Sequence, residues 1–504
     1  MLKLLRKIFN DKKNPPEQST QKKIKEQYIP TNLKKTIEIF KSLYHYPDNS
    51  DVYLRNLQIG GLEKKATILF INTITDSKAI EKQIIKPLLH NMKKTADISD
   101  IISVQAIHTE SKISKILKEV NNGSAILFLE KSSKALIIPM ADFKTRNLEK
   151  PENEVTLIGP KESFNEDVQT NISLIRKTLR NESLMVESFT ISERFNNEVY
   201  VLYVKDLANE KLVNNVKERV NSLTADSVQN IAILEELIED RPLSLFPSIL
   251  YTERPDRATF YLEDGYIVLL MPNSPSSLIL PATFWTFFHT SEDKYLRFLN
   301  GNFVRILRMI AIFISLFASS IYVALTEYHT EMIPVNILLS IATTREKVPF
   351  PPIVEIVLME IAFELIREAG LRVPTPIGPT IGIVGALILG QAAVEATIVS
   401  PIVVIVVALG GVSSFAIGDL SLNFALRLMK FVFIISAALF GLFGITAVFA
   451  MGMFYLVSVK SFGVPYFTPS TPTYTSSSDT IFRKLINQDF FRPGYLKPKD
   501  MTKK

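Results

Sequence analysis

Residues 348–396 read VPFPPIVEIVLMEIAFELIREAGLRVPTPIGPTIGIVGALILGQAAVEA, a mostly apolar stretch that nevertheless contains several acids. The carboxylates within it are Glu355, Glu360, Glu364, Glu368 and Glu395. A charge at membrane depth costs at least about 2.5 kcal/mol, so a chain that keeps several there uses them for ions, for substrates or to hold helices together. The stretch therefore predicts a membrane protein whose function depends on buried charge.

Three of these acids recur at a helical spacing. Glu360, Glu364 and Glu368 are four residues apart, which places them on one face of a helix, and Arg367 is within reach of Glu364. Such a helix either lies flat on the membrane with its acids in water or buries them. The residues between the acids are apolar, whereas a flat helix should show a wider polar face, so burial is favoured. The candidate ion-pathway residues are Glu355, Glu360, Glu364, Arg367, Glu368 and Glu395.

A ridge of small residues follows in the next apolar segment, residues 377–394. Gly378, Gly382, Ala386 and Gly390 are spaced four residues apart. Small residues at this spacing let helix backbones approach closely in lipid. We expect this ridge to be a helix-packing surface.

Further apolar runs extend the membrane domain. They are residues 306–326, 398–417 and 431–457, with a shorter run at 333–342. Arg305 and Arg308 place the start of the first run in the cytoplasm, and Arg427 and Lys430 are interpreted as a cytoplasmic turn. The basic C-terminal tail also favours the cytoplasm, which requires an even number of crossings. Either the short run is re-entrant or the last long run breaks at its glycines.

The first 300 residues have the composition of a soluble α/β protein. Residues 33–44 place apolar side chains on one helical face. Two later segments, beginning at Ala66 and Val199, resemble each other. Each is a β-branched strand, then a turn with an acid (Asp76 or Asp206), then an amphipathic helix. This echo predicts two related α/β subdomains.

A proline-rich stretch, residues 241–285, connects the two halves. Proline at this density prevents long helices, so we expect a β-rich connector with strands at residues 258–263 and 265–271. The aromatic cluster at residues 284–288 suits the headgroup layer of a membrane. We expect it to form an interfacial shelf on the cytoplasmic side.

The composition excludes several classes of function. The chain has no cysteine among 504 residues, which excludes a disulfide-stapled exterior and thiolate metal sites. Its 5 histidines lack ligand spacing, and neither a phosphate-binding glycine loop nor a nucleophile motif is present. We therefore expect no enzyme activity, no cofactor and no metal site. Residues 1–50 carry 11 Lys or Arg against 5 Asp or Glu, which suits anionic lipid better than nucleic acid.

These patterns together predict a cytoplasmic α/β region followed by an all-α polytopic membrane domain of about five or six segments. The expected parts are a basic flexible tail (1–32), a first α/β subdomain (33–150), a second (151–240), a proline-rich β connector with an interfacial shelf (241–300), the membrane domain (301–460) and a polar basic C-terminal tail (461–504).

The run at residues 348–396 resembles the GerA family of spore germination proteins, specifically its A-type subunit. The likeness extends from about residue 33 to residue 460. Shorter matches are TERPD from Thr252, residues 265–275, IGPKESFNED from Ile158, NISLIRK from Asn171 and SLFP from Ser244. Lys161 and Ser163 depart from the family's Gly-Pro-Arg-Glu-Gly-Phe element. INTITD from Ile71 departs from its Tyr-Ile-Asp-Gly-Leu pattern.

The resemblance implies a multi-pass subunit of a nutrient germinant receptor in the spore inner membrane. Such receptors combine the A-type subunit with a transporter-like B subunit and a lipoprotein C subunit. The A-type subunits are expected to self-assemble into a nutrient-gated channel for monovalent cations. A close paralogue branch acts in later ion release, and the motifs do not separate the two. A secondary transporter and a non-conducting signalling scaffold are the alternatives.

Overall fold

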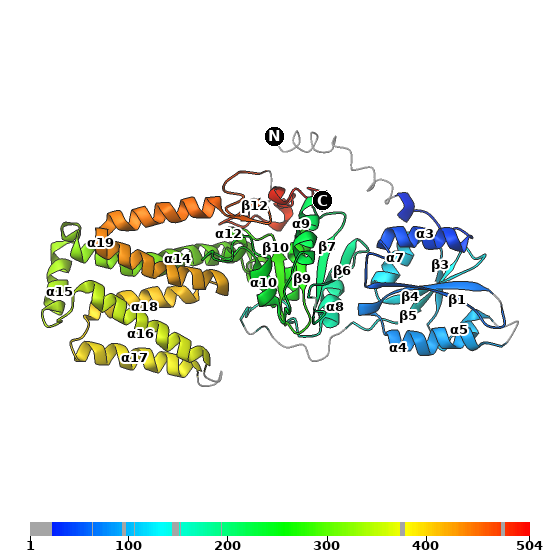
Figure 1. The fold of residues 1–504 in the computed structure, drawn as a ribbon, viewed down its shortest axis with the longest axis horizontal. Coiled ribbons are helices and arrows are strands. Elements are labelled where there is room, and N and C mark those ends of the chain that lie inside the picture. The colour runs from blue at the N-terminus through cyan, green and yellow to red at the C-terminus, as the bar shows by residue number, and fades with distance from the viewer. Residues whose placement is uncertain are drawn as a thin grey trace.

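The computed structural model describes residues 23–62, 64–92, 97–104, 106–143, 151, 153–192, 194–372, 378–474 and 479–503. The molecule is elongated, with two sheet-containing subdomains at one end and a bundle of helices at the other (Figure 1). The predicted order of an α/β region followed by a helical region is therefore present.

The first subdomain is a five-stranded antiparallel sheet with helices on both faces (Figure 1). Its helices and strands are α3 Leu33–Tyr44, β1 Val52–Gln58, β2 Lys65–Ile71, α4 Ser77–Ile80, α5 Lys86–His90, α6 Ile98–Ile101, β3 His108–Glu110, α7 Ile113–Asn121, β4 Ser124–Leu129 and β5 Ala135–Pro139. Along β2, Leu69 and Ile71 join the core with α3 and α7. Ile68 and Phe70 join the core with α4 and α5, because successive strand side chains point to opposite faces.

Local signals at the start of this subdomain are confirmed. Helix α3 covers the predicted residues and begins after Asn32, whose side chain accepts the Lys34 N–H. Asp76 caps α4 in the same way. The expected tail, residues 1–32, is described only from residue 23 on. Residues 1–22 lie outside the described residues, whereas Tyr28 forms a β-bridge with Lys112.

The second subdomain has its own five-stranded antiparallel sheet. Its helices and strands are α8 Val168–Thr178, β6 Leu184–Thr190, β7 Glu198–Val204, α9 Glu210–Asn221, α10 Ile231–Ile238, β8 Leu250–Thr252, α11 Pro255–Glu263, β9 Ile267–Leu270, β10 Ser277–Leu280, α12 Phe284–Phe288 and α13 Glu292–Tyr295. The strand order β6-β7-β9-β10-β8 repeats the order β1-β2-β4-β5-β3 of the first sheet. The echo between the segments at Ala66 and Val199 thus reflects equivalent strands, β2 and β7, of two sheets with one topology.

Three expectations for this region are wrong. The boundary expected at residue 240 divides one sheet, because β8, β9 and β10 complete it. The strand expected at residues 258–263 is helix α11, since Pro255 stands at the first helical position, where a proline fits. The aromatic cluster is internal. Trp285, Phe287 and Phe288 are buried in the core of the second subdomain and form no shelf at its surface.

The C-terminal residues are folded against the second subdomain. Strands β11 Lys460–Ser461 and β12 Val464–Pro465 form a small hairpin, and Tyr466 and Leu496 are buried in the core. The Tyr266 and Tyr495 hydroxyls lie 2.6 Å apart. The chain therefore returns to the sheet end of the molecule after the helical region (Figure 1).

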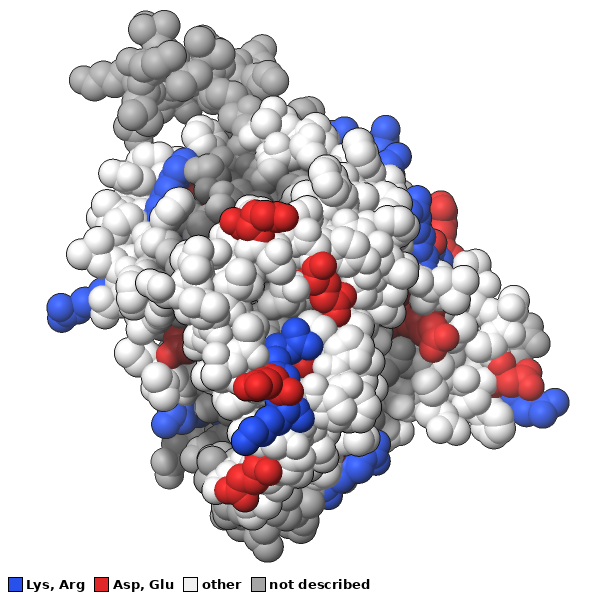
Figure 2. Space-filling model, turned by 90° about the vertical axis from the view of Figure 1, so that its left-hand side faces the viewer, with Lys and Arg blue, Asp and Glu red and all other residues white. Residues whose placement is uncertain are grey.

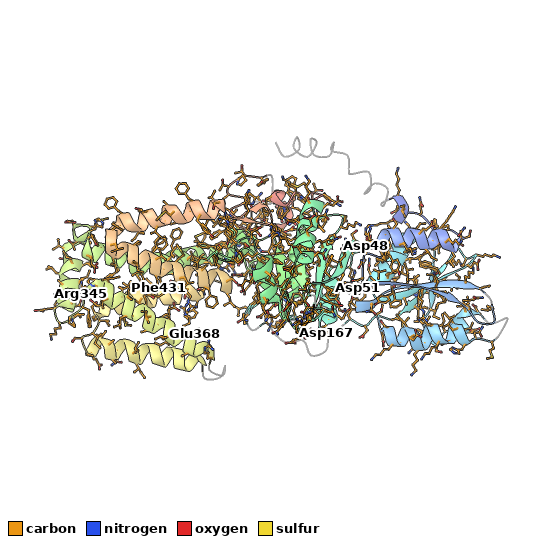
Figure 3. All side chains as sticks on the ribbon, viewed as in Figure 1. Asp48, Asp51, Asp167, Arg345, Glu368 and Phe431 are labelled. Carbon is orange, nitrogen blue, oxygen red and sulfur yellow. The ribbon has the colours of Figure 1, made fainter. Side chains whose placement is uncertain are left out.

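A buried ion pair joins the two subdomains. Asp51 precedes β1, and its carboxylate pairs with the Arg176 guanidinium from α8. The same carboxylate accepts the backbone N–H and the hydroxyl of Thr73, at 3.0 and 2.9 Å. Figure 3 places Asp51 between the two sheets.

The helical region consists of α14 Phe298–Glu327, α15 Val335–Arg345, α16 Pro352–Arg372, α17 Gly378–Glu395, α18 Pro401–Phe415 and α19 Leu420–Ser458. Within the described residues, two helices are long and apolar enough to cross a membrane, namely α14 and α19, and α18 is a shorter apolar helix. The short run at residues 333–342 forms α15 at the far end of the bundle (Figure 1).

Helix α19 reverses direction at Gly441. This residue has φ 59° and ψ −141°, and the two halves of α19 run back along each other (Figure 1). The end of α14 holds the reversal. The Tyr328 hydroxyl donates to the Ala438 carbonyl at 2.6 Å, and His329 Nε2 accepts the Leu442 N–H at 3.3 Å. The break of the last long run at a glycine, one of the two alternatives that give an even number of crossings, is therefore present in α19.

Candidate functional site

A cluster of ion pairs lies inside the helical bundle, between α16 and α19. Glu360 is fully buried. Lys430 Nζ lies 2.5 Å from its Oε2 atom, and the Ser319 hydroxyl of α14 donates to its Oε1 atom at 2.6 Å. Lys430 also lies 3.6 Å from Glu364 Oε1. Figure 3 labels Phe431, the residue after Lys430, about midway along the bundle.

Two arginines surround the second carboxylate. Arg427 of α19 pairs with Glu364 Oε2, and Arg367 Nη1 lies 4.0 Å from Glu364 Oε1. Arg367 also donates to the Ser414 hydroxyl at 2.5 Å and to the Gly411 carbonyl at 3.3 Å, both on α18. The cluster thus ties α14, α16, α18 and α19 together, with three cations against two carboxylates.

The interpretation of Arg427 and Lys430 as a cytoplasmic turn is wrong. Both lie within the first half of α19, and Lys430 is buried. The sequence held a signal for this arrangement. Arg427 and Lys430 are three residues apart, and Glu360 and Glu364 are four residues apart, so each pair lies on one face of its helix. A basic pair on one helix can therefore face an acidic pair on another.

The other candidate acids lie apart from this cluster. Glu355 is fully buried. Its carboxylate accepts from Arg345 Nε at 3.1 Å and from the Ser400 backbone N–H at 2.8 Å. Glu368 pairs with Arg372 on an exposed surface, and Glu395 accepts from Gln391. Figure 3 places Arg345 at the far end of the bundle and Glu368 toward the sheet subdomains.

The predicted ridge is described at one of its positions. A Cβ on Gly390 would lie 3.4 Å from Val404 Cγ1 of α18, an ordinary packing distance. The side-chain surroundings of Gly378, Gly382 and Ala386 lie outside the described residues. Among the described residues, no group of three or more His, Cys, Asp or Glu side chains is placed to hold a metal ion.

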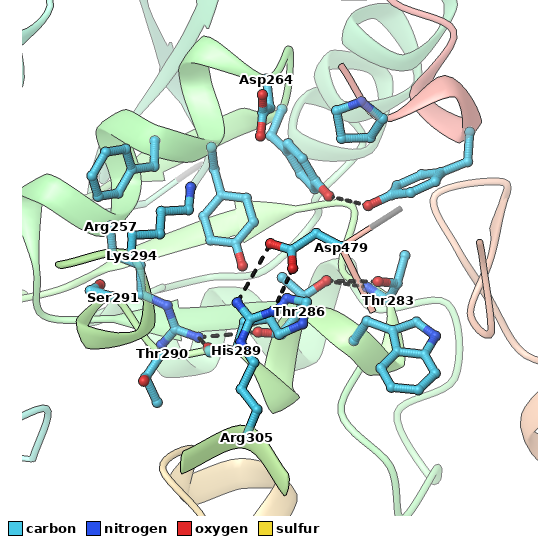
Figure 4. A pocket seen from close by; sticks show the side chains of 16 residues that line it. Arg257, Asp264, Thr283, Thr286, His289, Thr290, Ser291, Lys294, Arg305 and Asp479 are labelled. Carbon is cyan, nitrogen blue, oxygen red and sulfur yellow. Dashed lines mark hydrogen bonds and ion pairs between the residues drawn. The ribbon is translucent and has the colours of Figure 1, made fainter. Parts of the chain in front are cut away.

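A second charged cluster, which the sequence did not suggest, lies where α14 meets the second subdomain. Asp293 is buried and accepts from Arg305 Nε at 3.1 Å and from Arg308 Nη1 at 3.0 Å. Arg305 also pairs with Asp479 from the C-terminal residues. A cavity of about 70 Å³ beside Arg305 is lined by residues of the second subdomain, of α14 and of the C-terminal segment (Figure 4). Burial, and then the Arg305 guanidinium, lower the pKa of His289 in this cavity wall to about 4.

Comparison with known proteins identifies the family. A family model described as Bacillus/Clostridium GerA spore germination protein matches residues 38–495. The chain is 36% identical over 463 residues to spore germination protein KA of Bacillus subtilis strain 168. This alignment covers 90% of this chain and 85% of that protein. The chain belongs to the GerA family.

The chain is also similar to other proteins. Spore germination protein GerLA of Bacillus cereus is 34% identical over 460 residues, covering 90% of this chain and 94% of that protein. A solved structure, the N-terminal domain of the A subunit of the Bacillus megaterium spore germinant receptor GerK3, has a TM-score of 0.41 and 24% identity, covering 51% of this chain and 98% of that one. Within the GerA family, the chain is an A-type subunit.

Two GerA motifs named above meet at one place. Arg254 of TERPD is buried and donates to the Pro160 carbonyl at 2.8 Å, within the IGPKESFNED segment. The Ser163 hydroxyl donates to the Glu253 carbonyl at 3.1 Å. These contacts fix the segment that enters the second subdomain against the start of α11.

Proposed function

We propose that this A-type subunit is the membrane subunit of a spore germinant receptor, and that several copies form a nutrient-gated channel for monovalent cations in the spore inner membrane. The proposal places both sheet subdomains in the cytoplasm. It includes a transporter-like B subunit and a lipoprotein C subunit as partners, and it contains no catalytic step. Membership of the GerA family supports the role in germination.

The membrane placement is supported by the surface of the helical region. Many large apolar side chains are exposed on α14 and α19, among them Phe313, Phe443 and Phe454. At the end of the bundle that faces away from the sheets, most of the surface is uncharged, and the acidic and basic side chains lie in a band down its middle (Figure 2). An exposed apolar surface of this extent suits lipid or further copies of the chain.

The observation that carries the channel proposal is the buried cluster around Glu360 and Glu364. Ionised groups are costly in an apolar helical region and mark ion pathways there. Glu364 Oε1 is buried and has no hydrogen-bond partner, although Lys430 and Arg367 lie nearby. We take this arrangement as a closed state, in which the cations of α19 neutralise carboxylates that would otherwise attract permeant cations.

Reconstitution of the chain alone into liposomes tests the proposal, with the oligomer mass measured in the same preparation. A passive cation current from an oligomer is the expected result. Flux that saturates and is coupled to a substrate would assign a secondary transporter instead, and a monomer without flux would leave the scaffold.

A matched pair of variants tests the pathway itself. Glu364→Gln should reduce cation flux per protein, because it removes the carboxylate with the unused acceptor. Glu368→Gln is the control, since Glu368 lies on the same helix face in an exposed pair with Arg372. Equal flux from the two variants at equal protein amounts would remove Glu364 from the pathway.

One observation favours a second candidate, a non-conducting signalling scaffold. Glu355 and Glu360 are fully buried, and each has a cation and a further hydrogen-bond donor within its own chain. Buried pairs of this kind serve to fix helices relative to one another. The liposome experiment separates the two candidates.

A further inference from the structure

A short C-terminal segment, residues 482–486, presents large apolar side chains to the outside. Phe482 is 57% exposed, Leu485 is 45% exposed and Ile486 is 74% exposed. Lys484 between them is also exposed. Three large exposed apolar side chains within five residues form an apolar patch, and such patches usually mark a contact with a membrane or another molecule.

The segment is fixed in place against the start of α14. The Arg483 guanidinium donates to the carbonyls of Asp293 and Leu296, at 2.6 and 3.1 Å. Its backbone N–H donates to Asn302 Oδ1 at 2.7 Å, and the Asn302 amide donates back to the Arg483 carbonyl at 3.3 Å. The apolar side chains on either side of Arg483 are therefore held out from the protein by a polar anchor.

The patch continues onto an exposed apolar stripe of α14. Leu299, Phe303, Ile306 and Ile310 are exposed and follow each other at steps of four, three and four residues, so they share one helix face. Arg305 and Arg308 point from the opposite side toward Asp293. Asn302, which holds the segment, is the neighbour of Phe303, so segment and stripe meet at the first turns of α14.

We infer that residues 482–486 rest on the cytoplasmic headgroup layer of the membrane, with Phe482, Leu485 and Ile486 entering its acyl boundary and Lys484 meeting anionic phosphates. The inference rests on the proposed function, because it requires α14 to cross a bilayer. Lipid suits the patch better than a second copy, because the stripe runs on into the apolar span of α14 and basic side chains, Lys484 and exposed Arg297, flank its start.

The natural absence of cysteine makes the test direct. Spin labels are attached in separate variants Phe482→Cys, Leu485→Cys and Ile486→Cys, and the full chain is placed in nanodiscs that contain phosphatidylglycerol. Each label should collide several-fold more often with oxygen, relative to a water-soluble nickel chelate, than a label at Met92→Cys. Met92 is 91% exposed and belongs to the first subdomain, which lies at the opposite end of the molecule from the helical region (Figure 1). Labels at 482–486 with the collision ratio of the Met92 control would overturn the inference.

Two further measurements separate the ways in which it can fail. An Ile310→Cys label reports on α14 itself. If this label lies in lipid while those at 482–486 lie in water, the inference fails and the membrane placement stands. If the Ile310 label also lies in water, the placement fails too. The labels could also be shielded from both oxygen and the nickel chelate and show dipolar broadening that disappears on dilution with unlabelled protein. That result would assign the patch to a second copy and overturn the inference.

Discussion

Lys430 neutralises Glu360, a fully buried carboxylate of the helical bundle. Lys430→Met leaves Glu360 charged, fully buried and without its cation, which should destabilise the protein by about 3–5 kcal/mol. The double variant Lys430→Met/Glu360→Gln should recover most of that loss, because it removes both charges of the pair and leaves neither partner alone. Thermal unfolding in nanodiscs measures both. Glu368→Gln is the control, and an equal melting temperature for Lys430→Met and this control would contradict the role given to the pair.

His289, beside the charged cluster around Asp293 and Arg305, should make the stability of the protein depend on pH. Its pKa is lowered from 6.5 to about 4 by burial and by the Arg305 guanidinium, and its Nε2–H donates to the Thr480 carbonyl. The unfolded chain therefore binds the proton first, so the free energy of unfolding should fall as pH falls from 6.5 to about 4, by at most roughly 1.4 kcal/mol per pH unit.

Melting temperatures at pH 7 and pH 5 check this. His289→Gln keeps a donor for Thr480 but does not titrate, so its melting temperature should change less between the two values than that of the wild type. His108→Gln, at an exposed position on β3, should behave as the wild type. A pH dependence that is the same in all three proteins would exclude His289 as its source.

Burial of the acids, which the sequence favoured, holds for Glu360 but not for Glu368, and the sequence indicated only one of their partners. Arg367 was within reach of Glu364 on the same helix, and the two groups lie 4.0 Å apart. Lys430 and Arg427 were missed because their contacts cross from α16 to α19, and helical spacing constrains only neighbours on one helix. The charged cluster around Asp293 and Arg305 was missed for the same reason, since Asp479 and Arg305 are 174 residues apart.

Among the elements, α19 depends on a single glycine. A Cβ on Gly441 would lie 2.9 Å from His329 Nε2 and 3.0 Å from Tyr328 Cβ, and its φ of 59° with ψ of −141° is nearly restricted to glycine. Gly441→Ala should therefore destabilise the bundle by about 1–3 kcal/mol. Gly452→Ala, in the second half of the same helix with no atom within 4 Å of the added Cβ, should be neutral or stabilising. Thermal unfolding that ranks the two variants in the opposite order would refute this account of the reversal.

Elements with strong local signals could be predicted, and those set by tertiary contacts could not. Helix α3 follows from its apolar periodicity, and strand β2 follows from its run of apolar and β-branched residues. Helix α11 was taken for a strand because its aromatic and β-branched residues favour strands, while the decisive feature was the position of Pro255 at its start. The glycines of the last apolar run left its break open, since only the contacts with Tyr328 and His329 select Gly441.

For the whole molecule, the chain leaves the second subdomain in α14 and returns to it at β11 (Figure 1). If the bundle crosses the bilayer, this return requires an even number of crossings and places the sheet subdomains and the described C-terminal residues on one side. Maleimide labelling in intact cells that express single-cysteine variants tests the arrangement, because the chain has no cysteine of its own. The positions are Met92 in the first subdomain, Asn336 on α15 and Gln488 near the C-terminus, all exposed.

A membrane-impermeant maleimide should label Asn336→Cys from outside, because α15 lies at the end of the bundle farthest from the sheets (Figure 1). Met92→Cys and Gln488→Cys should react only after the membrane is permeabilised, since the sheets and the C-terminal residues share one side. Labelling of Gln488→Cys in intact cells would mean an odd number of crossings. That outcome is incompatible with the contacts that Arg305 makes with Asp479, and Asn302 with Arg483, across the start of α14.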